Sequence, residues 1–208
     1  MHVIYEAPAP CFRPLPPGPA LEAARQRYHL PEHFVLYVGT IEPRKNLPRL
    51  LEAFARLQKN GLTSFDLIFV GQRGWKDAPV ERLGLAGSVR FLEYVPIEDL
   101  VALYNLADVL AFPSLYEGFG LPVVEAMACE TPVVTSSSGS LGEIAGDAAE
   151  FVDPTDVTSI ADGLYRVLTC PARRAELRAR GLARAAQFTW MAAASQTRAL
   201  YLVAARSC

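Results

Sequence analysis

The sequence has few of the residues that build metal sites and disulfide frameworks. It contains only four cysteines and three histidines in 208 residues. The cysteines are far apart and include no Cys-x-x-Cys pair, which matches neither a zinc-ligand spacing nor a dense disulfide framework. We therefore expect reduced thiols in a cytoplasmic protein, no metal, no cofactor and no chemical role for the histidines. The residues concerned are Cys11, Cys129, Cys170, Cys208, His2, His29 and His33.

Long apolar runs and an excess of positive charge are also lacking. No stretch approaches the roughly 18 apolar residues of a membrane span, and the start of the chain lacks a basic segment followed by an apolar one. The formal net charge is −2. Such a chain offers no overall field for nucleic acid or an anionic membrane, so any anion site must be local. We predict no nucleic-acid partner, no membrane span and a cytoplasmic location, the alternative being peripheral attachment to the inner membrane face through a domain outside this sequence.

Short apolar runs, each too short for a helix, alternate with segments of helical composition. Continuous apolar runs suit strands that are covered on both faces, and helical crossovers between them predict a parallel sheet. The expected fold class is therefore α/β, a Rossmann-like three-layer α/β/α sandwich with a mainly parallel six-stranded sheet. The expected strands are residues 34–38, 66–70, 89–92, 108–112, 131–135 and 149–152.

Helical spacing is clearest just after the first expected strand. Leucine and phenylalanine recur at steps of three and four over residues 47–57, with Asn46 as the expected N-cap and Pro48 in the first turn. After Asp156 the chain is rich in alanine and arginine, which predicts helices over residues 161–168, 172–186 and 191–204. Alanine, glutamate and leucine separate the arginines, so a solvated helix face is a better explanation than a nucleic-acid surface.

The start of the chain differs from the rest in its proline content. Residues 8–19 include six prolines, which remove backbone donors and favour extended chain over a regular element. We predict that residues 1–33 are an interdomain linker and lead-in, 34–188 a Rossmann-like domain and 189–208 a C-terminal helix. Because linkers connect domains, we also expect a further domain before this one.

Two carboxylates eight positions apart mark the crossing from the fourth expected strand into a helix. Glu117 is followed by Gly118 and Gly120, which let backbone N–H groups approach a ligand. Glu125 has two acceptor oxygens, enough for two vicinal hydroxyls such as those of a ribose. Glu117 can serve sugar hydroxyls in the same way or stabilise positive charge. Both carboxylates can equally act as caps or partners of the helix dipole.

A second polar segment follows the first expected strand. Arg44 and Lys45 precede the helix over residues 47–57, so two cations and a positive helix end converge there. This suits a pyrophosphate, since arginine grips phosphate oxygens with a fork and lysine acts as a point charge. The alternative is a pair of surface basic residues near a turn. The Gly-x-Gly-x-x-Gly fingerprint of an NAD-binding fold is absent from this position.

With these motifs the chain resembles the donor-binding, C-terminal half of a retaining glycosyltransferase of family 4 (group 1), which has the two-domain GT-B fold and includes mannosyltransferases. The resemblance covers nearly everything after the linker and is most specific at Glu117 and Glu125 with their glycine loop. The matching segments are residues 37–46, 89–96, 115–129, 143–148 and 152–154. There are three departures from the family pattern, Thr40 at a usual arginine, Glu93 at a usual glycine and Gly142 at a usual proline.

The resemblance implies a function in polysaccharide biosynthesis and a role for each motif residue. The intact parent would transfer a hexosyl group, with retention, from a nucleotide diphosphate sugar to an acceptor hydroxyl. GDP-mannose is the favoured donor, with UDP- and ADP-sugars as alternatives. The acceptor glycan or lipid-linked saccharide would bind the missing N-terminal domain, against which residues 189–208 would pack. The implied catalytic residues are Glu117, Lys45 and Arg44, and the implied donor-binding residues are Glu125, Gly39, Thr40, Gly118, Phe119, Gly120, Leu121, Tyr94 and Val95.

Two other functions remain open from the sequence. One is a non-catalytic nucleotide-sugar-binding module, in which the fold persists without chemistry. The other is a sugar-nucleotide epimerase or a phosphorylase built on the same two-domain plan. We expect the 208-residue chain alone to bind donor but to transfer little or nothing.

Overall fold

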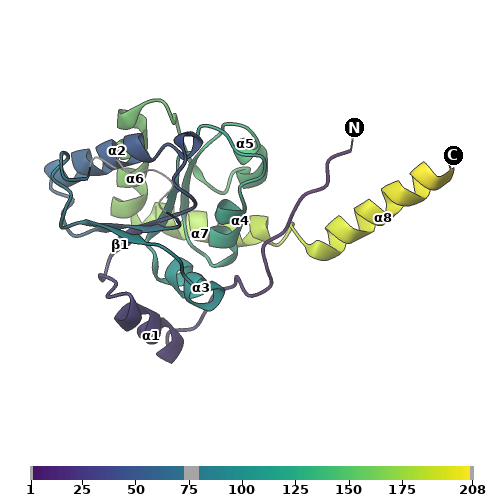
Figure 1. Ribbon diagram of the computed structural model, residues 1–208, viewed down its shortest axis with the longest axis horizontal. Helices are drawn as coiled ribbons and strands as arrows, with labels where there is room; N and C mark the ends of the chain where they lie inside the picture. Colours follow the sequence, from purple (N-terminus) through teal and green to yellow (C-terminus); the bar gives the residue numbers. More distant parts are fainter. Residues whose placement is uncertain (1, 73–79, 207–208) are drawn as a thin grey trace.

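Six parallel strands form the centre of the computed structural model, which describes residues 2–72 and 80–206 (Figure 1). The strand order is β3-β2-β1-β4-β5-β6, and every neighbouring pair is parallel. This confirms the predicted Rossmann-like sheet. The strands are β1 (Phe34–Val38), β2 (Asp66–Val70), β3 (Val89–Leu92), β4 (Val109–Phe112), β5 (Val133–Ser136) and β6 (Glu150–Val152).

Successive apolar side chains of β1, β2 and β4 enter two different hydrophobic cores, one on each face of the sheet. Phe34 and Leu36 of β1 belong to the core under α3 (Ile97–Leu106), α4 (Leu121–Ala128) and α5 (Leu141–Ala145). Val35 and Tyr37 belong to the core under α2 (Leu47–Lys59) and α6 (Val157–Thr169). Figure 1 shows α2 and α6 together on one side of the sheet and α3 on the other. All of β1 is buried, as a central strand covered on both faces requires.

The three C-terminal helices form as predicted, with ends that differ by a few residues. They are α6, α7 (Pro171–Ala185) and α8 (Trp190–Arg206). Three arginines of α7 make ion pairs within the domain: Arg173 with Glu150 and Glu176, Arg174 with Asp108 and Arg180 with Asp147. The structure therefore uses these arginines to fasten α7 to the sheet and to loops. The expected absence of a nucleic-acid partner stays a prediction.

A helix within residues 1–33 was not expected. This helix, α1 (Pro19–Arg27), packs on α3 through Leu21, Ala24 and Ala102. Its first residue is Pro19, whose fixed φ suits the first position of a helix. Proline density indicated extended chain for residues 8–19, and α1 begins only where that run ends. The predicted domain limits themselves stay predictions.

Asn46 occupies the predicted N-cap position of α2, but its side chain does not cap the helix. Its φ of 62° is left-handed and its side chain makes no capping hydrogen bond. Instead, the side-chain amide donates to the carbonyl oxygens of Pro113 (2.9 Å) and Pro154 (2.6 Å). Asparagine tolerates the left-handed region better than most residues. Asn46 thus ties the loop after β1 to the loop after β4.

Helix α8 projects from the body of the domain, on the side where the N-terminal segment also extends (Figure 1). Several large apolar side chains on it are exposed, among them Trp190, Met191, Tyr201 and Leu202. In residues 2–72 and 80–206, no helix has the length and hydropathy that crossing a membrane requires. Cys208 and the end of the predicted segment 189–208 lie outside the described residues.

The N-terminus of α6 offers a direct test of local helix stability. The Asp156 carboxylate accepts a hydrogen bond from the Thr158 backbone N–H at 2.8 Å. Replacing Asp156 with alanine should destabilise the domain by about 1 kcal/mol, because this N–H would lose its protein partner. Urea unfolding followed by circular dichroism measures the change. Cys170→Ala at the N-cap of α7 is the matched control, since Cys170 makes no capping bond there; equal effects of the two changes would refute the capping role.

Candidate functional site

The strand order reverses between β1 and β4, so the loops that follow these two strands lie side by side. They are joined directly, because the Leu115 N–H donates to the Arg44 carbonyl oxygen at 2.8 Å and Asn46 donates to Pro113. In open parallel sheets, ligands bind outside the carboxyl ends of the strands at this kind of switch point. The fold thus brings the two polar segments of the sequence into one place.

Arg44, Lys45 and Glu117 form one charged cluster at this switch point. Arg44 Nη1 lies 2.7 Å from Glu117 Oε2, and Lys45 Nζ lies 2.7 Å from Glu117 Oε1. The Glu117 and Lys45 side chains are 7% and 9% exposed, whereas that of Arg44 is 45% exposed. Two cations therefore share one buried carboxylate, which leaves this trio with one excess positive charge. Glu42, whose carboxylate is 44% exposed, also pairs with Arg44.

The short helix η1 (Pro43–Lys45) determines how the two cations point. It turns Lys45 inward, where Nζ lies 4.6 Å from the centre of the Phe112 ring, while Arg44 stays at the surface. Gly39, with a φ of +147°, adjoins the lysine: a Cβ on Gly39 would lie 3.6 Å from Lys45 Cε. Thr40, the other predicted donor contact in this loop, is exposed.

Three buried oxygen atoms beside the cluster make no regular hydrogen bond within the described part of the chain. They are Tyr37 Oη, Ser114 Oγ and Glu117 Oε1. Lys45 Nζ reaches Glu117 Oε1 at ion-pair distance without the angles of a hydrogen bond. Burial raises the pKa of Tyr37, so its hydroxyl stays protonated. Unpaired buried polar atoms are uncommon and call for an explanation, of which a polar ligand or water is one.

The loop that carries Glu117 is held by the segment after β5. Ser140 Oγ lies 3.1 Å from the Glu117 carbonyl oxygen and 2.9 Å from that of Phe119, so it donates to this pair. Gly120 has a φ of +99° and begins α4. Because Gly120 occupies the N-cap position and the Glu117 carboxylate binds cations, Glu117 is not a helix cap. The exposed backbone of Gly118 and the half-buried Phe119 lie between them.

Glu125 lies one turn into α4 and points toward α3. Its Oε2 accepts a hydrogen bond from the Tyr104 hydroxyl at 2.9 Å. Burial raises the pKa of Glu125, and the hydrogen bond from Tyr104 opposes this shift. Tyr104 was not predicted as a partner of Glu125, because it lies 21 residues away on another helix. The available signal was a tyrosine among the apolar residues of a helical segment, since a buried tyrosine hydroxyl needs a partner.

The two residues predicted to contact the nucleotide base follow β3. Val95 is buried in the core under α3, whereas the Tyr94 side chain is 82% exposed. An exposed aromatic ring beside the carboxyl end of a strand is available for stacking. Its role toward a base stays a prediction.

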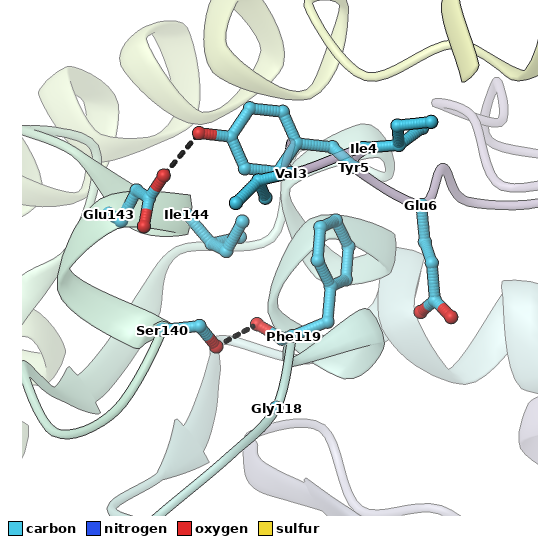
Figure 2. A pocket seen from close by; sticks show the side chains of 9 residues that line it. All are labelled: Val3, Ile4, Tyr5, Glu6, Gly118, Phe119, Ser140, Glu143 and Ile144. Atoms are coloured by element: carbon cyan, nitrogen blue, oxygen red, sulfur yellow. Dashed lines mark hydrogen bonds between the residues drawn. The ribbon is translucent and has the colours of Figure 1, made fainter. Parts of the chain in front are cut away.

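A cavity of about 370 Å³ adjoins the Glu117 loop (Figure 2). Figure 2 shows Tyr5 and Phe119 facing each other across it, with Tyr5 donating a hydrogen bond to Glu143 of α5. Residues 3–6 form one wall of this partly open cavity. Its lining combines two aromatic rings, two hydroxyls and two carboxylates, from residues Val3, Ile4, Tyr5, Glu6, Gly118, Phe119, Ser140, Glu143 and Ile144.

Structural comparison places this domain in the class of the GT-B glycosyltransferases. Sucrose-phosphate synthase from Thermosynechococcus elongatus matches with a TM-score of 0.82 and 30% identity, over 98% of this chain and 52% of that one. A second match is HepE from Anabaena in complex with UDP and glucose, with a TM-score of 0.83 and 24% identity, over 98% of this chain and 57% of that one. The fold class predicted from the sequence is confirmed.

The chain belongs to the family of group 1 glycosyl transferases, whose model matches residues 22–184. Among characterised relatives, O-antigen chain mannosyltransferase B of Escherichia coli is 45% identical over 177 residues. The match covers 83% of this chain and 46% of that relative, so the chain spans about half its length. The family resemblance inferred from Glu117, Glu125 and the surrounding motifs is therefore confirmed.

Proposed function

We propose that this domain binds the nucleotide diphosphate sugar donor of a retaining hexosyltransferase, with GDP-mannose as the favoured donor. The observation that carries the proposal is the charged cluster at the switch point of the sheet, in which the exposed Arg44 and the buried Lys45 share the buried carboxylate of Glu117. The name of the Escherichia coli relative supports mannosyl transfer. The UDP and glucose bound to HepE support a nucleotide-sugar ligand for this fold.

The cations of the cluster suit the diphosphate. As the bond between the sugar carbon and the diphosphate oxygen breaks, negative charge builds on the leaving phosphate and positive charge on the sugar. Arg44 and Lys45 stabilise the negative charge on the leaving phosphate, because preorganised cations act most strongly where charge develops. Glu117 lies between them and the glycine loop, where its carboxylate serves the sugar. The acceptor hydroxyl forms the new bond to the sugar carbon, the nucleoside diphosphate leaves, and the hydroxyl proton passes to an oxygen of the departing diphosphate.

The remaining predicted contacts surround this centre. Backbone groups of residues 118–121 would lie along the sugar and diphosphate, beside the cavity of Figure 2. Glu125 would accept hydrogen bonds from the two ribose hydroxyls, and Tyr94 with Val95 would contact the base. The acceptor would bind a second domain, consistent with a chain that spans about half of its relative. The exposed apolar side chains of α8 would then pack on that domain.

Isothermal titration calorimetry of the 208-residue chain with GDP, UDP and ADP tests the proposal. We expect binding of at least one nucleoside diphosphate, with a preference for GDP, and weaker binding of GMP because it lacks the β-phosphate. The charge-removing variant Arg44→Ala should weaken the diphosphate more than the monophosphate. Absence of binding by all three diphosphates, or equal binding of GDP and GMP, would refute the proposed donor site.

The raised pKa of Glu125 predicts that ribose recognition weakens in acid. An ionised carboxylate accepts from both ribose hydroxyls, and protonation removes part of that capacity. Because burial raises this pKa above its ordinary value, the loss should begin at a higher pH than for an exposed glutamate. The groups that face Glu125 are Tyr104 of α3 and Cys129 at the end of α4. Burial raises the pKa of the Cys129 thiol to about 12, so it stays neutral over this range.

The measurement is the affinity ratio of GDP to 2′,3′-dideoxy-GDP between pH 8 and pH 5. Both ligands carry the same diphosphate, so its own titration cancels in the ratio. We expect the ratio to fall as the pH decreases, and to be low and constant in Glu125→Gln. A ratio that is high and independent of pH in both proteins would show that Glu125 does not bind the ribose.

A further inference from the structure

Tyr104 is a completely buried tyrosine whose hydroxyl donates to Glu125 Oε2 at 2.9 Å. Helices α3 and α4, which carry the two residues, pack against each other. A hydroxyl buried without a hydrogen bond is costly, so this bond satisfies the phenol as well as the carboxylate. It leaves Glu125 Oε1 and one lone pair of Oε2 for other donors.

The ring and the backbone of Tyr104 are each held by a neighbouring residue. The Phe12 ring meets it edge to face, with a centroid distance of 5.7 Å. Thr131 Oγ1 donates to the Tyr104 carbonyl oxygen at 2.6 Å from the loop after α4. Burial raises the pKa of Tyr104 well above its ordinary value, so the hydroxyl remains a donor at any working pH.

The N-terminal segment that supplies Phe12 is itself fastened to α3. Asn105, the next residue after Tyr104, accepts a hydrogen bond from the Leu15 N–H at 2.7 Å. Its amide donates to the Arg13 carbonyl oxygen at 3.1 Å and to that of Val101 at 2.9 Å. Phe12 is 6% exposed and belongs to the core under α3. The support behind Tyr104 is therefore part of the packed domain.

A glutamate side chain has three rotatable bonds, and a ligand that must order it loses affinity. A carboxylate held beforehand by a buried donor avoids that loss. Tyr104 is such a donor, because neither its ring nor its backbone can move without disturbing the core. The hydrogen bond to one oxygen of Glu125 therefore sets the direction in which the other oxygen faces.

We propose that Tyr104 is a positioning residue, which orients the Glu125 carboxylate toward the vicinal hydroxyls of the nucleotide ribose. The inference rests on the proposed function, because it takes the ribose as the group that Glu125 binds. Tyr104 itself does not touch the ligand. Its effect is therefore expected only on ligands that carry ribose hydroxyls.

Calorimetry of the 208-residue chain with GDP and 2′,3′-dideoxy-GDP tests the inference. In the unchanged protein, loss of two hydroxyls bonded to a charged group should weaken binding about tenfold to a hundredfold. Tyr104→Phe keeps the ring and removes the hydroxyl. It should lower the affinity ratio of GDP to 2′,3′-dideoxy-GDP about fivefold, because only the binding of GDP becomes weaker. Adding Tyr104→Phe to Glu125→Gln should change nothing further, since the hydroxyl acts through the carboxylate.

Tyr28→Phe is the matched control. The Tyr28 hydroxyl donates to the Asp99 carboxylate of α3 at 2.7 Å, so it is also a bond from a tyrosine to a carboxylate, but away from Glu125. The Tyr28→Phe variant should have the same affinity ratio of GDP to 2′,3′-dideoxy-GDP as the unchanged protein. Should Tyr104→Phe fail to fold, Phe12→Leu retains the hydroxyl but loosens the ring, and it should lower the discrimination to a smaller extent.

The outcomes separate this inference from the proposed function. One outcome is that the unchanged protein prefers GDP to 2′,3′-dideoxy-GDP and the Tyr104→Phe variant, or Phe12→Leu in its place, shows the same affinity ratio. Tyr104 then has no positioning role, and the proposed donor site is unaffected. If the unchanged protein binds both ligands equally, Glu125 does not bind ribose and the inference is overturned with that assignment. If no nucleotide binds, both the proposed function and the inference are refuted.

Discussion

Lys45→Ala should weaken GDP binding to this chain by about tenfold to a hundredfold, because it removes a buried cation from the proposed diphosphate site. In the proposed two-domain hexosyltransferase the same change should lower turnover on the order of a hundredfold, since charge on the leaving phosphate peaks in the transition state. Lys45 is 9% exposed, so its charge is little screened by solvent. Calorimetry on the chain and steady-state kinetics on that two-domain enzyme measure the two effects.

Loss of Lys45 also leaves Glu117 with Arg44 as its remaining cation, so the stability of the variant must be measured beside its binding. Lys45→Met keeps the aliphatic stem against Phe112 and serves as a second variant if the alanine does not fold. The matched control is Lys59→Ala, which removes an exposed lysine from the last turn of α2. Unchanged donor affinity and unchanged turnover in a folded Lys45 variant would show that Lys45 is not part of the donor site.

The sheet could be predicted from the sequence because buried parallel strands are continuous apolar runs with clear ends. For β1, β2 and β3 even the limits agree. For β4, β5 and β6 the first residue was predicted one or two positions early, at Asp108, Thr131 and Ala149. Thr131 and Ala149 have strand-like or apolar character and Asp108 directly precedes an apolar run, but pairing with the neighbouring strand begins later. Strand pairing is a tertiary property that composition does not contain.

Helix α1, by contrast, could not be predicted from the sequence. It follows a proline-rich run, is polar on most of its surface and buries little beyond Leu21 and Ala24. Its stability comes from packing on α3, which cannot be inferred from nine residues. Tertiary context likewise set the role of Asn46. The residue type suited an N-cap, but two carbonyl oxygens from distant loops engage its side chain instead.

For the candidate site, the sequence predicted the residues but not their partners. Strand adjacency at the switch point was enough to bring Arg44, Lys45 and Glu117 to one edge of the sheet. That both cations share a single buried carboxylate is visible only in the structure. The structure also decides that neither Glu117 nor Glu125 is a helix cap, since one binds cations and the other Tyr104.

The Glu117 loop depends on a glycine in another segment, and Gly139→Ala should therefore disable the site without touching any charged group. Gly139 has a φ of +61°, and a Cβ there would lie 2.6 Å from the Glu117 carbonyl oxygen and 3.1 Å from its nitrogen. Backbone cannot give way as a flexible side chain can, so the loop must shift. Left-handed strain of about 1–2 kcal/mol and overpacking of about 1–3 kcal/mol together predict a destabilisation of about 2–5 kcal/mol. GDP affinity should fall more than tenfold, because the Glu117 carboxylate moves from its cations.

Gly84→Ala separates the two causes. Gly84 has a similar φ of +72°, and among the residues that the structure describes no atom lies within 4 Å of its added Cβ. This control carries the backbone strain without the overpacking, so it should cost about 1–2 kcal/mol and leave GDP affinity unchanged. Urea unfolding gives the stability of each variant, and calorimetry below the unfolding transition gives the affinity. The extra effect of Gly139→Ala is expected to arise from contact with the Glu117 backbone. If both variants lose the same stability and both keep full GDP affinity, the position of the Glu117 loop does not control the site.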